Sequence, residues 1–245
     1  MAITPSLSDR YVELGLWTDD RIGDLIPRQA ERFPDRELFA IDDQRVTYGQ
    51  FHEWVTAIAR QMASCGVGPG DRVVVQLPNC LEALVLQVAA FRVGALNVPV
   101  IPIYREHETR QILADTRPAV IAVAASLGAR TPCDETDALL AELGHRPVLK
   151  YAVGGPAHGW TTVPRLGDAA PHSVGAGELP APAAAEQPAL ILYTSGTTSA
   201  PKGPTSRRER CWRSCAIWPR SPGSTRHRWW PWARRCLIWA GSSRA

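Results

Sequence analysis

The sequence predicts an α/β protein with a largely parallel sheet flanked by helices. Near-continuous apolar runs of strand length occur at residues 72–77, 119–123 and 189–193, and such runs are typical of strands covered on both faces. Outside these runs, apolar residues recur with a helical period, most clearly from Phe51 to Met62, ahead of the first run. Strands that alternate with helices favour parallel strand–helix–strand units.

The individual elements are expected in a regular order. A short amphipathic helix begins at Ile22 and ends near Pro34, and two short strands follow on either side of Asp42-Asp43. Thr47 is placed to cap the helix that carries Phe51 to Met62 and stops at Gly66. The further expected elements are a strand at 72–77, a helix carrying Leu81 to Ala89, a strand at 95–103 that runs into a loop, a helix at 106–115, a strand at 119–123, a helix at 137–143, a strand at 148–153, a surface connection at 154–188 and a strand at 189–193.

The overall composition excludes several classes of protein. Hydrophobic residues make up 45% of the chain and charged residues 21%, which is typical of a globular protein and not of a disordered or collagen-like one. No apolar run approaches the ~18 residues that a membrane-spanning helix needs, and the N-terminus shows no secretory signal. We therefore expect a cytoplasmic protein. Six cysteines without a C-x-x-C pair argue against a disulfide scaffold.

The composition changes abruptly near residue 204. Residues 204–245 carry ten arginines and one glutamate, with no lysine or aspartate, and so have a net charge of +9; residues 1–203 therefore carry −6 of the total +3. The same tail holds six of the nine tryptophans. We expect three parts: a first α/β subdomain at 1–188, a strand with its loop at 189–203, and an irregular or disordered tail at 204–245.

The residues that carry chemistry follow the last strand of the body. The segment from Thr194 to Gly203 contains five hydroxyl side chains, two glycines and one lysine. Small residues let backbone N–H groups approach an anion closely, and a lysine supplies a mobile positive charge suited to phosphate. The segment is not a Walker A loop, because Pro201 stands where that motif needs glycine. It predicts a phosphate-binding loop at the end of a parallel strand.

This segment resembles a known family signature. YTSGTTSAPKG at 193–203 is similar to the phosphate-loop motif [YF]-T-S-G-[ST]-T-G-x-P-K-G of the adenylate-forming superfamily, except that Ser199 replaces the usual glycine. The stretches at 46–51, 66–79 and 97–108 look like acyl-CoA synthetases, and NVPVIPIYREHE most resembles the cyclohexanecarboxylate and medium-chain acyl-CoA ligase branch. The resemblance covers about residues 10–203.

The resemblance implies an ATP-dependent carboxylate–CoA ligase. Such enzymes use Mg²⁺ and ATP to form an acyl-adenylate from a small-molecule carboxylate, and then transfer the acyl group to coenzyme A. By this resemblance the β- and γ-phosphates of ATP would be bound by Thr194, Ser195, Gly196, Thr197, Thr198 and Lys202. The family's Y-G-x-T-E and T-G-D motifs are absent from the 245 residues, so no catalytic residue or metal ligand is assigned, and we expect this chain to be an inactive N-terminal fragment.

The tail is interpreted as a shifted reading frame. Because tryptophan has a single codon, reading one base out of frame forces valine from Trp229-Trp230 and alanine from Trp218-Pro219. With synonymous bases chosen freely elsewhere, residues 211–243 can be re-read as an amphipathic helix, a strand and a PLSHLGG phrase similar to this branch of the family. We expect a frameshift near codon 203.

The basic tail also suggests alternative functions, each of which has a simpler explanation. The arginine- and tryptophan-rich tail could make the chain a basic nucleic-acid-binding remnant, or the body a non-catalytic nucleotide-binding one, but an unfolded out-of-frame peptide is the simpler explanation. A zinc site from Cys211, Cys215, His227 and Cys236 has poor ligand spacing. His52 is interpreted as a surface residue, and the Glu106-His107 pair as a solvated helix start.

Overall fold

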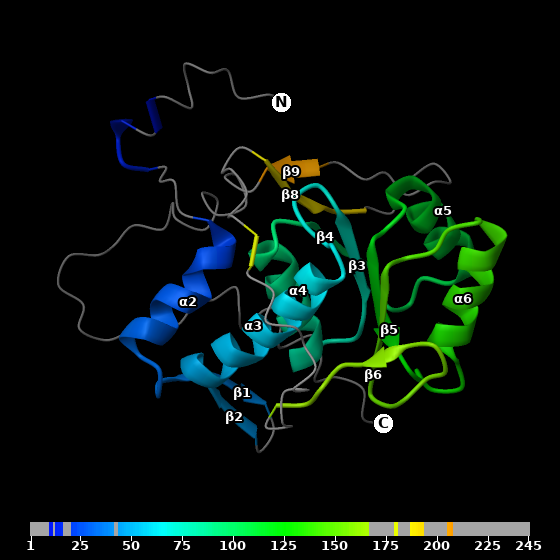
Figure 1. Ribbon diagram of the computed structural model, residues 1–245, viewed down its shortest axis with the longest axis horizontal. Coiled ribbons are helices and arrows are strands. Elements are labelled where there is room, and N and C mark those ends of the chain that lie inside the picture. Colours follow the sequence, from blue (N-terminus) through cyan, green and yellow to red (C-terminus); the bar gives the residue numbers. More distant parts are fainter. Residues whose placement is uncertain are drawn as a thin grey trace, which may run out of the picture.

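A seven-stranded sheet forms the centre of the computed structural model (Figure 1). Its strand order is β7-β6-β5-β3-β4-β8-β9, and every pair is parallel except β8 and β9. The structure describes residues 10–11, 13–16, 21–41, 44–166, 179–180, 187–193 and 205–207. The strands of this sheet are β3 (Arg72–Gln76), β4 (Leu96–Pro99), β5 (Val120–Ala124), β6 (Leu149–Val153), β7 (Thr161–Thr162), β8 (Pro188–Ile191) and β9 (Thr205–Arg207).

Helices cover both faces of the sheet, as Figure 1 shows. On one face lie α2 (Ile22–Arg32), α3 (Tyr48–Ser64) and α4 (Leu81–Arg92), and on the other lie α5 (Glu106–Thr116) and α6 (Pro132–Glu142). The predicted α/β class with a largely parallel sheet flanked by helices is therefore confirmed. Within the part of the chain that the structure describes, no helix is long and apolar enough to cross a membrane.

The alternation of side chains along the strands creates two apolar cores. Val73 and Val75 of β3 belong to the core beneath α3 and α4, whereas Val74 belongs to a second core beneath α5 and α6. This second core cluster also contains Val98 of β4. Successive strand residues point to opposite faces, so one apolar run fills both layers. Burying each such side chain contributes about 1.5–3 kcal/mol to folding.

A separate antiparallel hairpin precedes the sheet. Strands β1 (Glu37–Ile41) and β2 (Gln44–Thr47) pair at the position that the sequence predicts. Thr47 then caps α3: its Oγ1 accepts a hydrogen bond from the Gln50 backbone at 3.2 Å, and the Gln50 side chain accepts one from the Thr47 backbone at 3.0 Å. This capping box confirms the predicted helix start.

Three elements differ from the sequence expectation. Helix α6 begins at Pro132 and not at Asp137, because proline fits the first turn of a helix, where its missing N–H costs nothing. The connection at 154–188 contains β7, which pairs with β6. Residues 205–207 form β9 against β8, which corrects the expectation that the whole 204–245 tail is irregular. The rest of the tail lies outside the described residues.

Candidate functional site

The carboxyl edge of the parallel strands holds the candidate site, as is usual for open α/β sheets. Strand β8 runs parallel to β4 and ends at Ile191, three residues before Thr194. Strand β9 then returns antiparallel, with Thr205 paired to Ile191. The chain therefore leaves and re-enters the sheet at the same point of this edge, and the predicted phosphate loop joins the two strands.

The predicted phosphate-binding residues themselves lie outside the described residues. These are Thr194, Ser195, Gly196, Thr197, Thr198 and Lys202. The structure shows the strand that leads to them and the strand that follows them, and it gives no distances within the loop. Their assignment to phosphate remains a prediction.

Two described residues lead directly into this loop. Leu192 is exposed, and Tyr193 is half-buried against the second core cluster. Burial raises the pKa of the Tyr193 phenol, and the negative charge of Asp115 adds to this. Tyr193 therefore stays neutral at physiological pH.

A loop beside β8 brings further apolar side chains to the same edge. Segment 101–105 follows β4, the parallel neighbour of β8. Its Ile101 and Ile103 side chains are 48% and 77% exposed, and Leu192 is 45% exposed. Three large apolar side chains are thus presented to solvent at the edge where the predicted phosphate loop begins. A cluster of exposed apolar side chains is typical of a surface that binds a ligand or another macromolecule.

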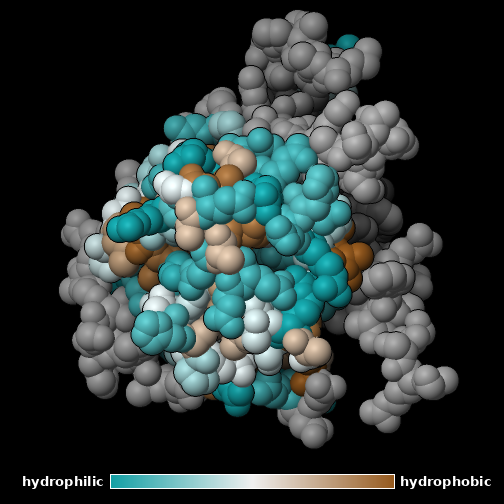
Figure 2. All heavy atoms as spheres, turned by 90° about the vertical axis from the view of Figure 1, so that its right-hand side faces the viewer, coloured by the Kyte–Doolittle hydropathy of each residue, from teal (hydrophilic) through white to brown (hydrophobic). Residues whose placement is uncertain are grey.

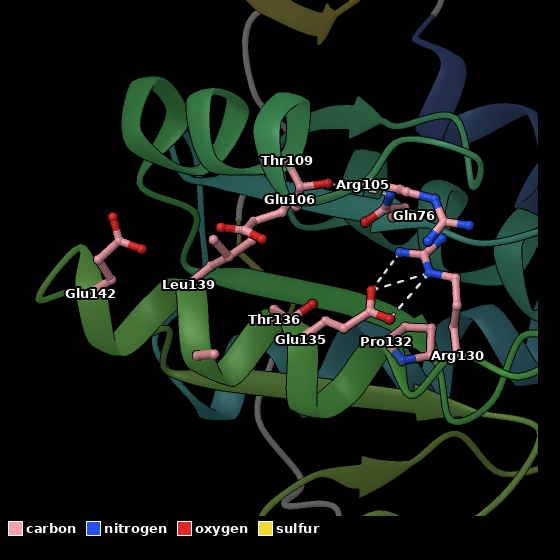
Figure 3. Close-up of a pocket in the computed structure, with 11 residues that line it drawn as sticks. Gln76, Arg105, Glu106, Thr109, Arg130, Pro132, Glu135, Thr136, Leu139 and Glu142 are labelled. Atoms are coloured by element: carbon pink, nitrogen blue, oxygen red, sulfur yellow. Dashed lines mark hydrogen bonds and ion pairs between the residues drawn. The ribbon is translucent and has the colours of Figure 1, made fainter.

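A cavity of about 430 Å³ opens between α5 and α6 (Figure 3). The face that bears these two helices is mostly hydrophilic, with smaller apolar areas between the polar ones (Figure 2). Gln76, at the carboxyl end of β3, lines the cavity together with side chains of α5, of α6 and of the loop before α6. The lining residues are Gln76, Arg105, Glu106, Thr109, Arg130, Pro132, Glu135, Thr136, Ala138, Leu139 and Glu142.

The charged side chains of the cavity pair with one another. The Arg130 guanidinium donates from Nε to both carboxylate oxygens of Glu135 at 3.2 Å, and a second nitrogen also contacts Oε2. This hydrogen bonding lowers the pKa of Glu135 and raises the pKa of Arg130. At the outer end, Arg110 bridges Glu106 of its own helix and Glu142 of α6. The pairs neutralise much of the charge around the cavity, so it offers no strong attraction to an anion.

The structure can be compared with three further assignments made from the sequence: the start of helix α5, His52 and the alternative zinc site. Glu106 and His107 are exposed in the first turn of α5, as expected for a solvated helix start. His52 is half-buried, and its Nδ1 is buried without a hydrogen-bond partner among the described residues. The four residues of the zinc alternative lie outside the described residues. Among the described residues, no cluster of three or more His, Cys, Asp or Glu side chains could hold a metal ion.

Sequence reasoning missed two residues that organise this edge, Gln76 and Arg130. Gln76 carried a weak signal, because it is a polar residue within an apolar run, near the end of a strand. Arg130 carried none, because its partners Pro102 and Tyr104 are 28 and 26 residues away in sequence.

Comparison with known proteins shows the family of the chain. The family described as AMP-binding enzyme matches residues 26–230, which is most of the chain. The chain belongs to the AMP-binding enzyme family. The match continues past the composition change at residue 204 into the tail.

Individual relatives of this family catalyse different ligations. The chain is 32% identical over 197 residues to Triostin synthetase I of Streptomyces triostinicus, covering 80% of this chain and 35% of that protein. It is 34% identical over 172 residues to Propionate–CoA ligase of Salmonella typhimurium, covering 66% of this chain and 27% of that protein. Among solved structures, the apo structure of Mycobacterium smegmatis MbtA superimposes with a TM-score of 0.71 at 26% identity, over 85% of this chain and 38% of that one.

The chain therefore spans about a third of the length of these relatives. Members of the AMP-binding enzyme family are ATP-dependent enzymes that adenylate acyl or aryl carboxylates and ligate them. The matching portion is the N-terminal part of the adenylate-forming fold.

Proposed function

We propose that the chain is the ATP-phosphate-binding portion of an acyl-CoA synthetase. The observation that carries the proposal is the YTSGTTSAPKG segment, which directly follows a parallel strand at the carboxyl edge in a chain of the AMP-binding enzyme family. Thr194, Ser195, Gly196, Thr197, Thr198 and Lys202 are proposed to bind the β- and γ-phosphates of ATP. The full reaction consumes a small-molecule carboxylate, ATP and coenzyme A.

The proposed chemistry has two balanced steps. A carboxylate oxygen attacks the α-phosphorus of ATP, the bond between the α- and β-phosphates breaks, and pyrophosphate leaves with the electron pair. Hydroxyl, backbone N–H and lysine donors of the loop stabilise the charge that develops on this leaving group. The thiol of coenzyme A then attacks the acyl carbonyl, loses its proton and displaces AMP.

The choice of coenzyme A and of an acyl substrate is part of the proposal. The relatives include Acetyl-coenzyme A synthetase of Chromobacterium violaceum as well as peptide synthetases. The NVPVIPIYREHE phrase favours the cyclohexanecarboxylate and medium-chain acyl-CoA ligase branch.

The proposed organisation divides the chain at residues 188 and 203. Residues 1–188 form the first α/β subdomain, and 189–203 form the strand and loop that start the second. Residues 204–245 are proposed to be out of frame. Sequencing the gene across codons 195–245 tests this: a single-base change that restores PLSHLGG and continues into Y-G-x-T-E supports a shifted frame, and an intact frame contradicts it.

Binding of MgATP tests the phosphate site directly. The chain has only two lysines, Lys202 in the loop and Lys150 in β6, where its Nζ pairs with Asp137 at 2.7 Å. Loss of a charge-assisted hydrogen bond to phosphate weakens binding by about tenfold to a hundredfold. We expect this weakening for Lys202→Ala in equilibrium binding and no change for Lys150→Ala. Equal affinities in the two variants would overturn the assignment.

A second measurement concerns catalysis. The 245-residue chain is expected to show no carboxylate-dependent exchange of pyrophosphate into ATP, because the family motifs that follow the phosphate loop are absent from it. Exchange above background, lost in Lys202→Ala, would show that the proposed inactivity is wrong.

A further inference from the structure

The cavity between α5 and α6 has a positive inner end and a negative outer end. At the inner end, the charges of Arg105 and Arg130 both act on one carboxylate, that of Glu135. At the outer end, one arginine, Arg110, is bound by two glutamates. Glu135 is therefore the carboxylate that neutralises the inner end, and without it two arginines would face the cavity unopposed.

Glu135 occupies the edge of Arg130 that binds anions best. Nε donates to both carboxylate oxygens at 3.2 Å, and a second nitrogen contacts Oε2 (Figure 3). This edge of a guanidinium carries two parallel N–H groups, and it binds a carboxylate and a phosphate in the same way. The Glu135 side chain is 41% exposed, whereas that of Arg130 is 17% exposed. Glu135 can therefore turn into solvent by rotating its own side chain, while the guanidinium stays behind.

Arg130 keeps its position without Glu135, because backbone carbonyl groups hold the rest of the guanidinium. Its Nη1 donates to the carbonyl oxygen of Pro102 at 3.1 Å, and its Nη2 donates to that of Tyr104 at 3.5 Å. The Tyr104 carbonyl oxygen is fixed in turn by Gln76 Nε2 at 3.0 Å. When Glu135 leaves, the vacated edge is thus an oriented pair of donors that faces the cavity.

A second donor at the inner end has no partner. Thr136 is 3% exposed, its hydroxyl lines the cavity, and no side-chain hydrogen bond of Thr136 exists among the described residues (Figure 3). The first turn of α6, which starts at Pro132, borders the same space, and the N-terminal end of a helix favours negative charge. The hydroxyl and the two guanidinium groups are donors of the kind that bind phosphate oxygens.

We propose that this cavity is a binding site for a phosphate group, and that Glu135 closes it by occupying Arg130 in place of the phosphate. Arg130, Arg105 and Thr136 bind the phosphate oxygens once Glu135 turns away. The cavity volume of about 430 Å³ lies within the range of small-molecule sites, about 300–1,000 Å³, so it also has room for the rest of a phosphate ester. The inference is independent of the proposed function, because none of these residues belongs to the predicted phosphate loop.

Glu135→Ala tests the proposal, because it removes the carboxylate that closes the site. We expect inorganic phosphate to bind this variant at least about tenfold more tightly than the wild type in isothermal titration calorimetry. Glu142→Ala is the matched control: it removes a carboxylate of the same helix and the same cavity, but one that is bound by Arg110 and not by Arg130. Its affinity for phosphate should equal that of the wild type. Methyl phosphate, measured in parallel, distinguishes a phosphate ester from the free ion as the ligand.

Further variants locate the bound phosphate. Arg130→Met, added to Glu135→Ala, should abolish the gain in affinity, and Thr136→Val, added in the same way, should reduce it. The predicted phosphate loop is identical in all these proteins, so any phosphate that it binds does not affect the comparison. Glu135→Gln removes the charge but keeps the shape, so its affinity should lie between those of the wild type and Glu135→Ala. It also provides the test if Glu135→Ala does not fold.

Three results would overturn the proposal. Glu135→Ala and Glu135→Gln, shown to be folded by slow hydrogen exchange in β3 and β5, could bind phosphate no better than the wild type. Glu142→Ala could gain as much affinity as Glu135→Ala, which would mean that only the net charge matters. The gain could also persist with Arg130→Met, which would place the phosphate elsewhere. The proposed function stands in each case, because MgATP binding and Lys202→Ala test it separately.

Discussion

Gly23 lies where helix α2 crosses the end of helix α4 in near backbone contact. A Cβ atom on Gly23 would stand 2.9 Å from the carbonyl oxygen of Phe91 and 3.1 Å from its carbonyl carbon. Backbone atoms cannot swing aside as a flexible side chain can, so α2 would have to shift. The Asp24–Arg92 ion pair at 3.3 Å joins the same two helices and would be strained by that shift.

Gly23→Ala is therefore expected to destabilise the protein, although alanine favours helix formation. Overpacking of this kind costs about 1–3 kcal/mol, which exceeds the roughly 1 kcal/mol gained in helix propensity. Urea unfolding should show a net loss. Gly68→Ala is the control, because a Cβ there meets no atom within 4 Å. A Gly23→Ala midpoint at or above that of the wild type would contradict the close crossing.

His52 couples this helix junction to pH. Burial lowers the pKa of His52 below its ordinary value of 6.5, and the positive charge of Arg92 lowers it further, while Glu31 and Glu53 oppose the shift. The unfolded chain therefore takes up a proton at higher pH than the folded chain does. The stability that depends on neutral His52 is present above pH 6.5 and is lost as the pH falls from there towards the folded pKa.

The pH dependence can be isolated between pH 7.5 and pH 5.5. Over this range the urea midpoint should fall more in the wild type than in His52→Gln. His107→Gln, which changes an exposed histidine, serves as the control and should behave as the wild type. An identical fall in all three proteins would mean that His52 does not carry the effect.

At the scale of elements, the capping box at the start of α3 is a single local unit. Thr47 and Gln50 satisfy each other's backbone N–H groups. Replacing a capping threonine by alanine costs about 1 kcal/mol. We expect that loss for Thr47→Ala in urea unfolding, and a much smaller one for Thr47→Ser, which keeps the hydroxyl. Equal losses in the two variants would mean that the methyl group and not the cap stabilises the helix.

The same scale shows what the sequence could and could not predict. Strands β3 and β5 and helix α3 were predictable because their buried residues follow a regular pattern within one short stretch of sequence. Strands β7 and β9, of two and three residues, were not, because such short strands exist only through their partners. The phosphate motif was readable as a local run, whereas the contacts of Gln76 and Arg130 with segment 101–105 depend on the fold.

At the scale of the whole molecule, the central strands of the sheet are hydrogen-bonded and buried more completely than its edge strands. Strands β3 and β5 are bonded on both sides and covered on both faces, and β5 is buried along its whole length. Hydrogen exchange of backbone amides should therefore be slowest in β3 and β5 and fastest in β7 and β9. Protection in β9 equal to that in β5 would show that further structure covers this border.

The two edge strands of the sheet are short, and this affects how copies of the chain associate. An edge strand pairs with a strand of another molecule only if it offers a sufficiently long row of free backbone N–H and C=O groups. Strand β7 offers two residues and β9 offers three. Self-association through growth of the sheet is thus disfavoured at both described borders. Aggregation of this protein would instead begin at exposed apolar side chains such as Ile103, and substitution of Ile103 by a charged residue would oppose it.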